Sequence, residues 1–288
     1  MAVGVPPGDR VIGADRVVGA AREGESPPSG RLRGRRVLVI GGGQDDRGQP
    51  SADTPVGNGR AIAVNAARQG AAVVITDVAA DRTAGTIALH AANANAPVER
   101  IEAIIADATD ETAMEHVFAE TVEVLGGLDA LVVNVGIGGP AWLANTSSDD
   151  WDRVFAVNAR AHFIACKLGL RHLADDSSIV LIASVAGSRS GSRIPAYDSS
   201  KAALGGLMRH AAFEGQRSRT RVNVVAPGLI DTSIGREATR HRPSRLSGQL
   251  PLGREGTAWE IAHVVAFLLS DEASYVNAQW IGVDGGLT

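Results

Sequence analysis

Tyr197 and Lys201 are the residues of this chain whose types and spacing best fit proton-transfer chemistry. They lie four positions apart, so in a helix their side chains share one face, one turn apart. A free phenol has a pKa of about 10 and is a poor base at neutral pH. An ammonium group one turn away favours the phenolate and lowers that pKa. The pair is therefore predicted to exchange a proton near neutral pH.

Ser184 is the third candidate and lies thirteen positions before the tyrosine, at the end of the apolar, strand-like run 178–184. Its hydroxyl is expected to hydrogen-bond a carbonyl or alcohol oxygen. Taken alone, the tyrosine–lysine pair also fits a surface tyrosine beside a solvated lysine, which is the commoner arrangement. The serine spacing and the motifs further along the chain favour the catalytic interpretation.

Composition limits what this chain can do. It has 288 residues, 44% of them hydrophobic, which suffices for one large globular domain. The formal net charge of −4 gives no reason to expect nucleic acid or an anionic membrane as a partner. Cys166 is the only cysteine, so a packed thiol is expected rather than a disulfide, a zinc cluster or a nucleophile. A small-molecule substrate, no metal and a cytoplasmic location are therefore expected, since no apolar run is long enough to span a membrane.

Residues 1–34 differ in composition from the rest of the chain. They are rich in Gly and Pro, contain the near-repeat DRVIGA-DRVVGA, and lack the apolar core of a signal peptide. We predict a flexible N-terminal arm over residues 1–34, followed by a single catalytic domain over residues 35–288.

From residue 36 onward, short Val/Ile runs alternate with Ala-rich helical stretches. Strands are expected at residues 37–40, 72–76, 100–106, 130–134, 178–184, 222–226 and 279–283. Helices are expected at residues 60–69, 111–124, 150–173, 202–214 and 259–269. This alternation, with almost wholly apolar strands, predicts a Rossmann-type doubly wound parallel sheet, a three-layer α/β/α fold. Ligands of such sheets bind at the carboxyl ends of the strands.

Glycines follow the first expected strand. Gly41 opens a Gly-Gly-Gly run, and Gly57 and Gly59 stand just before a helical stretch. Glycines at a strand-to-helix turn let the backbone approach a pyrophosphate, and the helix N-terminus favours its charge. Asp77 ends the second strand, where a carboxylate accepts hydrogen bonds from the two hydroxyls of an adenine ribose and repels a 2′-phosphate. The alternative for Asp77 is a helix N-cap, because a helix is expected just after it.

At this point the chain resembles the single-domain branch of the short-chain dehydrogenases/reductases, from residue 36 to the C-terminus. Asn134-Val135-Gly136 is similar to the family's Asn-Ala-Gly motif. The four residues of the family's catalytic set have counterparts in Asn158, Ser184, Tyr197 and Lys201. The segments 227–232, 251–254 and 283–286 also read as family landmarks.

The resemblance implies an NAD(P)-dependent oxidoreductase that interconverts a secondary alcohol and a ketone. It is expected to resemble a carbonyl reductase, an alcohol dehydrogenase or a 3-oxoacyl-thioester reductase. By this resemblance Tyr197 exchanges the proton, Lys201 lowers the tyrosine pKa and binds the nicotinamide ribose, Ser184 orients the substrate oxygen, and Asn158 holds a water. The cofactor-binding residues it implies are Gly41, Gly57, Gly59, Asp77, Asp107, Asn134, Gly136, Tyr197, Lys201, Pro227, Gly228 and Thr232. Because of Asp77, NAD(H) is expected to be preferred, with NADP(H) not excluded.

The chain departs from the family pattern in its glycine turn. Ile40 replaces the usual threonine, and Gly57 lies sixteen positions after Gly41 because about a dozen residues are inserted around 44–50. We expect a solvent-exposed excursion that leaves Gly57 and Gly59 in place, and a flap over the adenosine is the functional alternative. The second departure is Val133 and Val135 around Asn134, which suggests altered packing.

The substrate is not identified by the sequence. Its pocket is expected between residues 137–142, residues 187–195 and the loop after Gly228. That loop carries five basic residues, which fit either an anionic substrate or a solvated lid: Arg236, Arg240, His241, Arg242 and Arg245. By resemblance the small residues after Tyr197 favour a homo-oligomer, a tetramer or a dimer. Two other functions stay open: an enoyl-reductase-like relative, against which the four-residue tyrosine–lysine spacing argues, and a non-catalytic cofactor-binding regulator.

Overall fold

The structure is a computed structural model that describes residues 30–45, 54–92, 100–239 and 250–288. Its centre is a seven-stranded parallel sheet in the order β3-β2-β1-β4-β5-β6-β9. The strands are β1 (Arg36–Ile40), β2 (Ala72–Asp77), β3 (Ile101–Ile105), β4 (Ala130–Val133), β5 (Ser178–Ile182), β6 (Arg221–Pro227) and β9 (Trp280–Val283). The chain runs outward in both directions from the β1–β4 pair, so the expected doubly wound, Rossmann-type sheet is confirmed.

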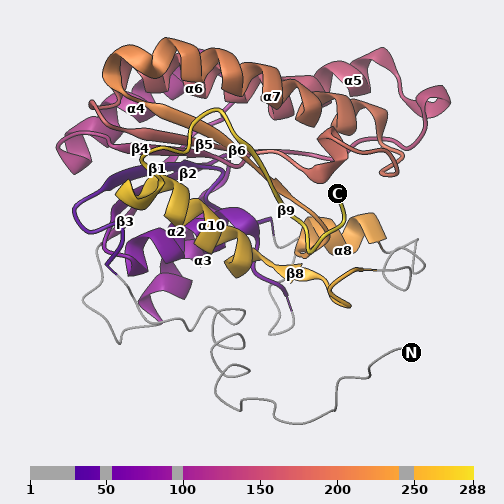
Figure 1. The fold of residues 1–288 in the computed structure, drawn as a ribbon, viewed down its shortest axis with the longest axis horizontal. Coiled ribbons are helices and arrows are strands. Elements are labelled where there is room, and N and C mark those ends of the chain that lie inside the picture. The colour runs from indigo at the N-terminus through magenta and orange to yellow at the C-terminus, as the bar shows by residue number, and fades with distance from the viewer. Residues whose placement is uncertain (1–29, 46–53, 93–99, 240–249) are drawn as a thin grey trace, which may run out of the picture.

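Helices cover both faces of this sheet (Figure 1). One layer contains α2 (Asn58–Arg68), α3 (Ala80–Ala91) and α10 (Ala258–Leu269), and the other contains α4 (Glu111–Leu125), α6 (Ala161–His172) and α7 (Pro195–Glu214). Within β1, Val37 and Val39 belong to the core under the first layer, whereas Leu38 and Ile40 belong to the core under the second. Since both faces of the strand are buried, its sequence is apolar throughout rather than alternating.

Local sequence signals place several helix ends. Asp110 accepts hydrogen bonds from two backbone N–H groups at the start of α4 (2.9 and 3.1 Å), and Gly126 ends that helix in the left-handed conformation, with φ of 70°. Thr257 and Glu260 form a capping box at the start of α10. Pro195 stands in the first turn of α7, where its missing N–H costs nothing.

The long helix expected over residues 150–173 is interrupted. It is divided into α5 (Ser148–Phe155), a π-helical turn at Ala156–Arg160, and α6. The helix expected over residues 202–214 begins earlier, at Pro195. The remaining short helical turns are 3₁₀ segments: η1 (Leu143–Asn145), η3 (Val185–Gly187), η4 (Gly215–Ser218) and η5 (Asp271–Ala273).

A second, two-stranded parallel sheet lies beside the main one, where β7 (Ile230–Asp231) pairs with β8 (Gly256–Thr257). Together with α8 (Ser233–Thr239) it lies at the lower right of Figure 1, near the C-terminus. Strands of two residues are too short to show any periodicity, so the sequence did not indicate them.

Residues 30–34 lead into β1, and Leu32 among them is fully buried. Its N–H donates to the Gln69 main-chain oxygen at the end of α2 (3.0 Å). Residues 1–29, most of the predicted flexible arm, lie outside the described residues, so the arm and its boundary with the catalytic domain remain predictions. Within the described ranges, no helix is both long and apolar enough to cross a membrane.

Candidate active site

Tyr197 and Lys201 both lie on α7, so the helix on which their spacing depends is confirmed. Lys201 is buried, and its Nζ donates hydrogen bonds to the main-chain oxygens of Ile182 (2.9 Å) and Val135 (3.4 Å). Ile182 is the last residue of β5, and Val135 lies just beyond β4. The lysine head group is therefore fixed at the carboxyl ends of two adjacent central strands, where ligands of such sheets bind.

The charge of Lys201 is poised near neutral pH. Its two hydrogen-bond partners are neutral carbonyls, so they only partly replace the hydration of an ammonium group. Burial lowers the pKa of Lys201 to about 7. The group therefore exchanges between amine and ammonium in the range where the proposed proton transfer operates. Cys166 is also buried, and burial raises the pKa of its thiol to about 12, which agrees with the packed, unreactive thiol expected from the sequence.

Ser184 lies just past β5, in extended backbone at the start of η3. Its Oγ accepts a hydrogen bond from the Ala186 N–H (3.2 Å). The segment after it packs directly on α7, because a Cβ on Gly187 would lie 2.8 Å from both the Lys201 carbonyl carbon and the Ala202 nitrogen. Close backbone contact thus brings the serine loop to the helix that carries the tyrosine and lysine.

Asn158 is fully buried and lies in the π-helical turn between α5 and α6. Its Nδ2 donates to the Ile137 carbonyl (2.9 Å), and its Oδ1 accepts from the Ile137 N–H (2.8 Å). Both polar groups of the Asn158 side chain thus bind the backbone of Ile137, and this fixes the loop that follows β4. π-helical turns are rare and occur often at functional sites, which agrees with the role predicted for this residue.

Ser200 is a buried polar residue of this site that was not singled out from the sequence. Its Oγ donates to the Tyr197 main-chain oxygen (2.8 Å) and accepts from the Asn158 Nδ2 (3.1 Å). It thereby joins the catalytic turn of α7 to the π-helical turn. Its only sequence signal is a small polar residue immediately before Lys201, on the buried side of the helix.

His162, one turn after Asn158, is also buried at this site and was not singled out. Neither ring nitrogen has a hydrogen bond of good geometry. Burial and, secondarily, the charge of Lys201 hold the pKa of His162 well below its usual range, although the nearby carbonyls of Val133 and Ile182 oppose the shift. The imidazole is therefore neutral, and it lies near the same Ile182 carbonyl that accepts a hydrogen bond from the Lys201 amine.

The turn between β1 and α2 holds the predicted glycines in a tightly packed arrangement. Gly41 has φ of 78°, a conformation that favours glycine. A Cβ on Gly59 would lie 1.9 Å from the Gly41 carbonyl oxygen and 2.6 Å from the Asn134 Nδ2. Helix α2 begins here with Gly57 as its N-cap and without a side-chain cap. Only glycines allow the helix N-terminus to approach the strand end this closely, so these residues fit a bound pyrophosphate.

Asn134 and Gly136 follow the central strand β4, at the same edge of the sheet as the glycine turn. The Asn134 Nδ2 donates to the Gly41 carbonyl (3.0 Å), which ties the end of β4 to the glycine turn. A Cβ on Gly136 would lie 3.0 Å from the Lys201 Nζ. The glycine therefore leaves the space beside the amine open.

Asp77 lies at the carboxyl end of β2, beside the glycine turn. Its carboxylate accepts hydrogen bonds from the N–H groups of Gly43 (3.2 Å) and Val78 (2.9 Å). The Arg82 Nη1 lies 3.6 Å from the Asp77 Oδ1. Burial raises the pKa of Asp77 from its usual value, against the lowering effect of those hydrogen bonds and of Arg82. The N-cap alternative is wrong, since the N-cap of α3 is Ala79 and has no side-chain hydrogen bond.

Asp107 follows β3, whose last residue pairs with Asp77 of β2. Its Oδ1 accepts hydrogen bonds from the Thr109 N–H and Oγ1, both at 2.8 Å. The residue therefore lies one strand further out than Asp77 at the same edge of the sheet, and its contact with the adenine remains a prediction.

Pro227, Gly228 and Thr232 lie around the end of β6. Pro227 is its last residue, and a Cβ on Gly228 would lie 2.6 Å from the Asp284 Cα. The Thr232 Oγ1 accepts a hydrogen bond from the Gly235 N–H (3.0 Å), the arrangement of a helix cap at the start of α8. Thr232 therefore has a structural role as a helix cap, and its contact with the nicotinamide remains a prediction.

The insertion in the glycine turn is described only at its root, because residues 46–53 lie outside the described residues. Asp45 is exposed, as expected for a polar excursion. Gln44 is not, since only 7% of it is exposed, so the expectation of solvent exposure was wrong for this residue. Its carboxamide is buried because it satisfies two backbone groups of the turn, a tertiary contact that composition does not reveal.

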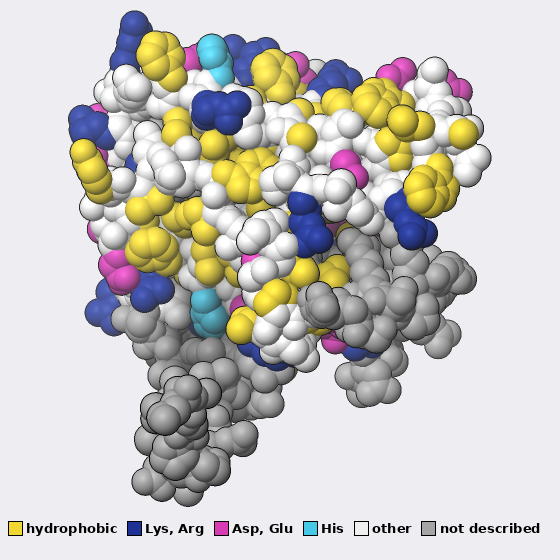
Figure 2. Space-filling view, turned by 45° about the vertical axis from the view of Figure 1, so that its right-hand side comes forward, with side chains coloured by type: hydrophobic (Ala, Val, Ile, Leu, Met, Phe, Trp, Pro, Cys, Tyr) yellow, Lys and Arg dark blue, Asp and Glu magenta, His cyan; other side chains and the backbone are white. Residues whose placement is uncertain are grey.

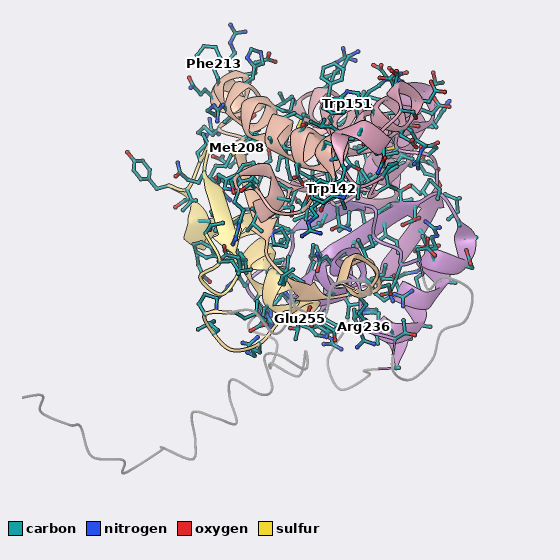
Figure 3. The ribbon with its side chains drawn as sticks, turned by 90° about the vertical axis from the view of Figure 1, so that its right-hand side faces the viewer. Trp142, Trp151, Met208, Phe213, Arg236 and Glu255 are labelled. Carbon is teal, nitrogen blue, oxygen red and sulfur yellow. The ribbon has the colours of Figure 1, made fainter. Side chains whose placement is uncertain are left out.

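Two of the segments predicted to wall the substrate pocket meet each other. The Trp142 N–H donates to the Arg193 main-chain oxygen (2.8 Å), and the Arg193 guanidinium lies 5.0 Å from the centre of the Trp142 ring. Both residues have φ of 71°, a strained conformation for side chains of this size. Figure 3 looks onto this side of the molecule, with Trp142 above Arg236 and Glu255.

The basic loop after Gly228 is only partly described. Arg236 is paired with Asp231 through two hydrogen bonds (2.6 and 2.9 Å), so its charge is already compensated. The other four basic residues, Arg240, His241, Arg242 and Arg245, lie outside the described residues. The described part of this loop therefore gives no support for an anionic substrate.

A doubly wound parallel sheet, a glycine turn at a helix N-terminus and a buried lysine one turn after a tyrosine on the same helix together define a nucleotide-binding oxidoreductase of Rossmann type. A family model described as enoyl-(acyl carrier protein) reductase matches residues 54–288. The 3-oxoacyl-[acyl-carrier-protein] reductase FabG of Thermotoga maritima is 30% identical, over 89% of this chain and 99% of its own length. Levodione reductase of Leifsonia aquatica is 33% identical over 91% of this chain and 97% of its own length. The chain belongs to the short-chain dehydrogenase/reductase family.

Solved structures agree with this assignment. The crystal structure of levodione reductase has a TM-score of 0.80 at 32% identity and covers 89% of this chain and 98% of its own. A short-chain dehydrogenase from Burkholderia cenocepacia in complex with NADP has a TM-score of 0.78 at 32% identity, with the same coverage of 89% and 98%.

Proposed function

We propose that this protein interconverts a secondary alcohol and a ketone with a nicotinamide dinucleotide, using Tyr197, Lys201, Ser184 and Asn158. The observation that carries the proposal is the convergence on one turn of α7. Lys201 is fixed at the ends of β4 and β5, the serine loop packs on the lysine backbone, and Asn158 is joined to the tyrosine turn through Ser200.

When bound, the nicotinamide supplies the hydride chemistry, and the protein supplies position and proton transfer. Tyr197 gives its phenolic proton to the substrate oxygen in reduction and takes it back in oxidation. The Ser184 hydroxyl donates a hydrogen bond to the same oxygen and orients it. Lys201 in its ammonium form stabilises the phenolate electrostatically, and its third N–H, beyond the two directed at carbonyls, is available to a ribose hydroxyl.

The glycine turn is where the dinucleotide would be held. Gly41, Gly57 and Gly59 would lie against the pyrophosphate, Asp77 against the adenine ribose, Asp107 against the adenine, and Pro227, Gly228 and Thr232 against the nicotinamide. We propose a preference for NAD(H), because the Asp77 carboxylate accepts from ribose hydroxyls without any reordering. A kcat/KM for NADPH equal to or above that for NADH would overturn this preference.

A homo-oligomer is proposed from the face formed by α6 and α7. A hollow on this face is lined by Arg160 and by five apolar residues: Ala159, Phe163, Ala203, Leu204 and Leu207. Phe163 is 50% exposed and Phe213 on α7 is 68% exposed. Figure 2 shows apolar side chains between basic ones along the upper layer, to which α7 belongs. Light scattering after size exclusion tests this, and a mass near that of one chain would refute it.

The direct test of the proposed activity is a turnover screen. Purified protein would be incubated with a panel of secondary alcohols and ketones, 3-oxoacyl thioesters and 2-enoyl thioesters, each with NAD(H) and NADP(H). Turnover of ketones or alcohols supports the proposal. Turnover of enoyl thioesters alone would favour the enoyl-reductase alternative, and tight cofactor binding with no turnover of any class would favour the non-catalytic regulator.

A further inference from the structure

The root of the insertion is fixed at the cofactor end of the sheet by Gln44. The Gly57 N–H donates to the Gln44 Oε1 (2.5 Å), and the Gln44 Nε2 donates to the Pro55 carbonyl (3.0 Å). One carboxamide thus joins the first described residues of the inserted segment to the last, directly before α2. Because Asp45 is the next residue along the backbone, this clamp restricts where its carboxylate can lie.

Asp45 forms an ion pair with Arg82 of α3. The Arg82 Nη2 lies 3.1 Å from the Asp45 Oδ2, and its Nη1 lies 3.6 Å from the Asp77 Oδ1. The exposed fractions of the Asp45, Arg82 and Asp77 side chains are 46%, 32% and 13%. Two carboxylates therefore flank one guanidinium beside the position proposed for the adenine ribose.

The ion pairs of Arg82 determine whether its guanidinium is available to bind the 2′-phosphate of NADP(H). A guanidinium is well suited to bind phosphate, because its planar donors match the phosphate oxygens. If Arg82 faced only Asp77, it would be available to compensate the repulsion between that carboxylate and a 2′-phosphate. Asp45 prevents this in two ways, since it occupies one edge of the guanidinium and adds a second negative charge.

We propose that the root of the insertion selects NAD(H) over NADP(H), because Asp45 withholds Arg82 from a 2′-phosphate, with Gln44 as the residue that positions Asp45. The inference rests on the proposed function, since it concerns the same cofactor site. It assigns a role to the part of the chain that departs most from the family pattern. The pair is partly exposed, so the effect is a graded preference rather than an absolute block.

The test measures binding of NADH and of NADPH separately to the full-length protein, without substrate, by fluorescence titration. In Asp45→Asn the affinity for NADPH should rise about tenfold, or about 1.4 kcal/mol, while that for NADH changes less than about twofold. Asp81→Asn is the matched control, because Asp81 is an exposed carboxylate adjacent to Arg82 in the first turn of α3. It should leave both affinities unchanged.

Arg82→Gln completes a double-mutant cycle. The gain from Asp45→Asn should disappear in the Arg82→Gln background, because the released guanidinium is its source. Gln44→Ala should shift the NADPH-to-NADH affinity ratio in the same direction by a smaller factor, a change that general loosening of the fold would not produce.

Three results would overturn the inference: an unchanged affinity ratio in Asp45→Asn, an equal gain in Asp81→Asn, or a gain that survives Arg82→Gln. Failure of the proposed catalysis alone looks different, because the wild-type protein would then still bind cofactor and this test would still apply. Failure of the proposed cofactor site is distinguished by a wild-type protein that binds neither cofactor. That outcome would remove this inference as well.

Discussion

Replacing Lys201 by Met is expected to change how the stability of this protein depends on pH. Lys201 is 3% exposed, and burial lowers its pKa from 10.5 to about 7. Between those two pH values the unfolded chain binds a proton on this lysine and the folded chain releases it. Stability therefore rises with pH across this window, and below pH 7 the cost of burying the charge is present in full.

The size of the effect follows from the two pKa values. A difference of one full proton contributes about 1.4 kcal/mol per pH unit, and half of that at the folded-state pKa. Between pH 7 and pH 9 the wild-type protein should gain about 2 kcal/mol relative to Lys201→Met. The neutral amine retains two N–H donors, which are enough for the Ile182 and Val135 carbonyls, so deprotonation does not break the local hydrogen bonds.

The assay is urea unfolding of both proteins at pH 6, 7, 8 and 9 and at one protein concentration. The quantity of interest is the difference in unfolding free energy between the two proteins, because titrating groups that do not interact with Lys201 cancel in it. His162, whose pKa the Lys201 charge helps to lower, stays neutral in both proteins because burial is the main cause of its shift. Lys201→Gln serves as a second neutral variant, in case Met packs poorly. A difference that stays constant or falls between pH 7 and pH 9 would refute the assignment of Lys201 as a buried amine with a lowered pKa.

Two further substitutions test the catalytic and cofactor halves of the site. Tyr197→Phe should lower kcat on the best substrate by about a hundredfold or more while NADH binding stays nearly intact, because the phenylalanine ring packs like that of tyrosine but lacks the acidic hydroxyl. A kcat near wild type would show that another group transfers the proton. Gly59→Ala should lower the thermal midpoint and weaken NADH binding more than about tenfold, because the added Cβ lies 1.9 Å from the Gly41 oxygen and forces a backbone shift. Gly138→Ala is its control, since a Cβ there meets nothing within 4 Å, and equal behaviour of the two variants would contradict the steric argument.

The sheet could be predicted because its strands are buried on both faces and leave an apolar signature. The expected strands agree with the structure to within two residues at each end. The π-helical turn was missed because the apolar positions over residues 150–173 fit one continuous helix about as well as two offset ones. Strands β7 and β8 were missed because hydrogen bonding between distant segments, rather than local pattern, creates them.

The candidate site likewise has parts that the sequence predicts and parts that it does not. Tyr197 and Lys201 could be placed together from the sequence, because a helix fixes the geometry of a four-residue step. The contact of Gly187 with the Lys201 backbone and the bridge through Ser200 depend on how three segments pack, which no local spacing reports. The expected solvent exposure of Gln44 was wrong because local composition does not show its tertiary hydrogen bonds. A polar residue in a Gly/Pro-rich stretch usually faces water, but here two backbone groups satisfy it inside the protein.

The π-helical turn at Ala156–Arg160 is a place where the chain can lose a residue without moving the helix that follows. A π turn contains one residue more than an α turn but completes the same revolution. Deleting one residue between Asn158 and Ala161 would therefore leave a regular α turn, and α6 would keep its orientation relative to α5. His162 and Cys166 would stay buried, whereas the turn that presents the Asn158 side chain to Ile137 would be rebuilt. A one-codon gap in a relative at this position would therefore indicate a changed Asn158 turn and not a displaced α6.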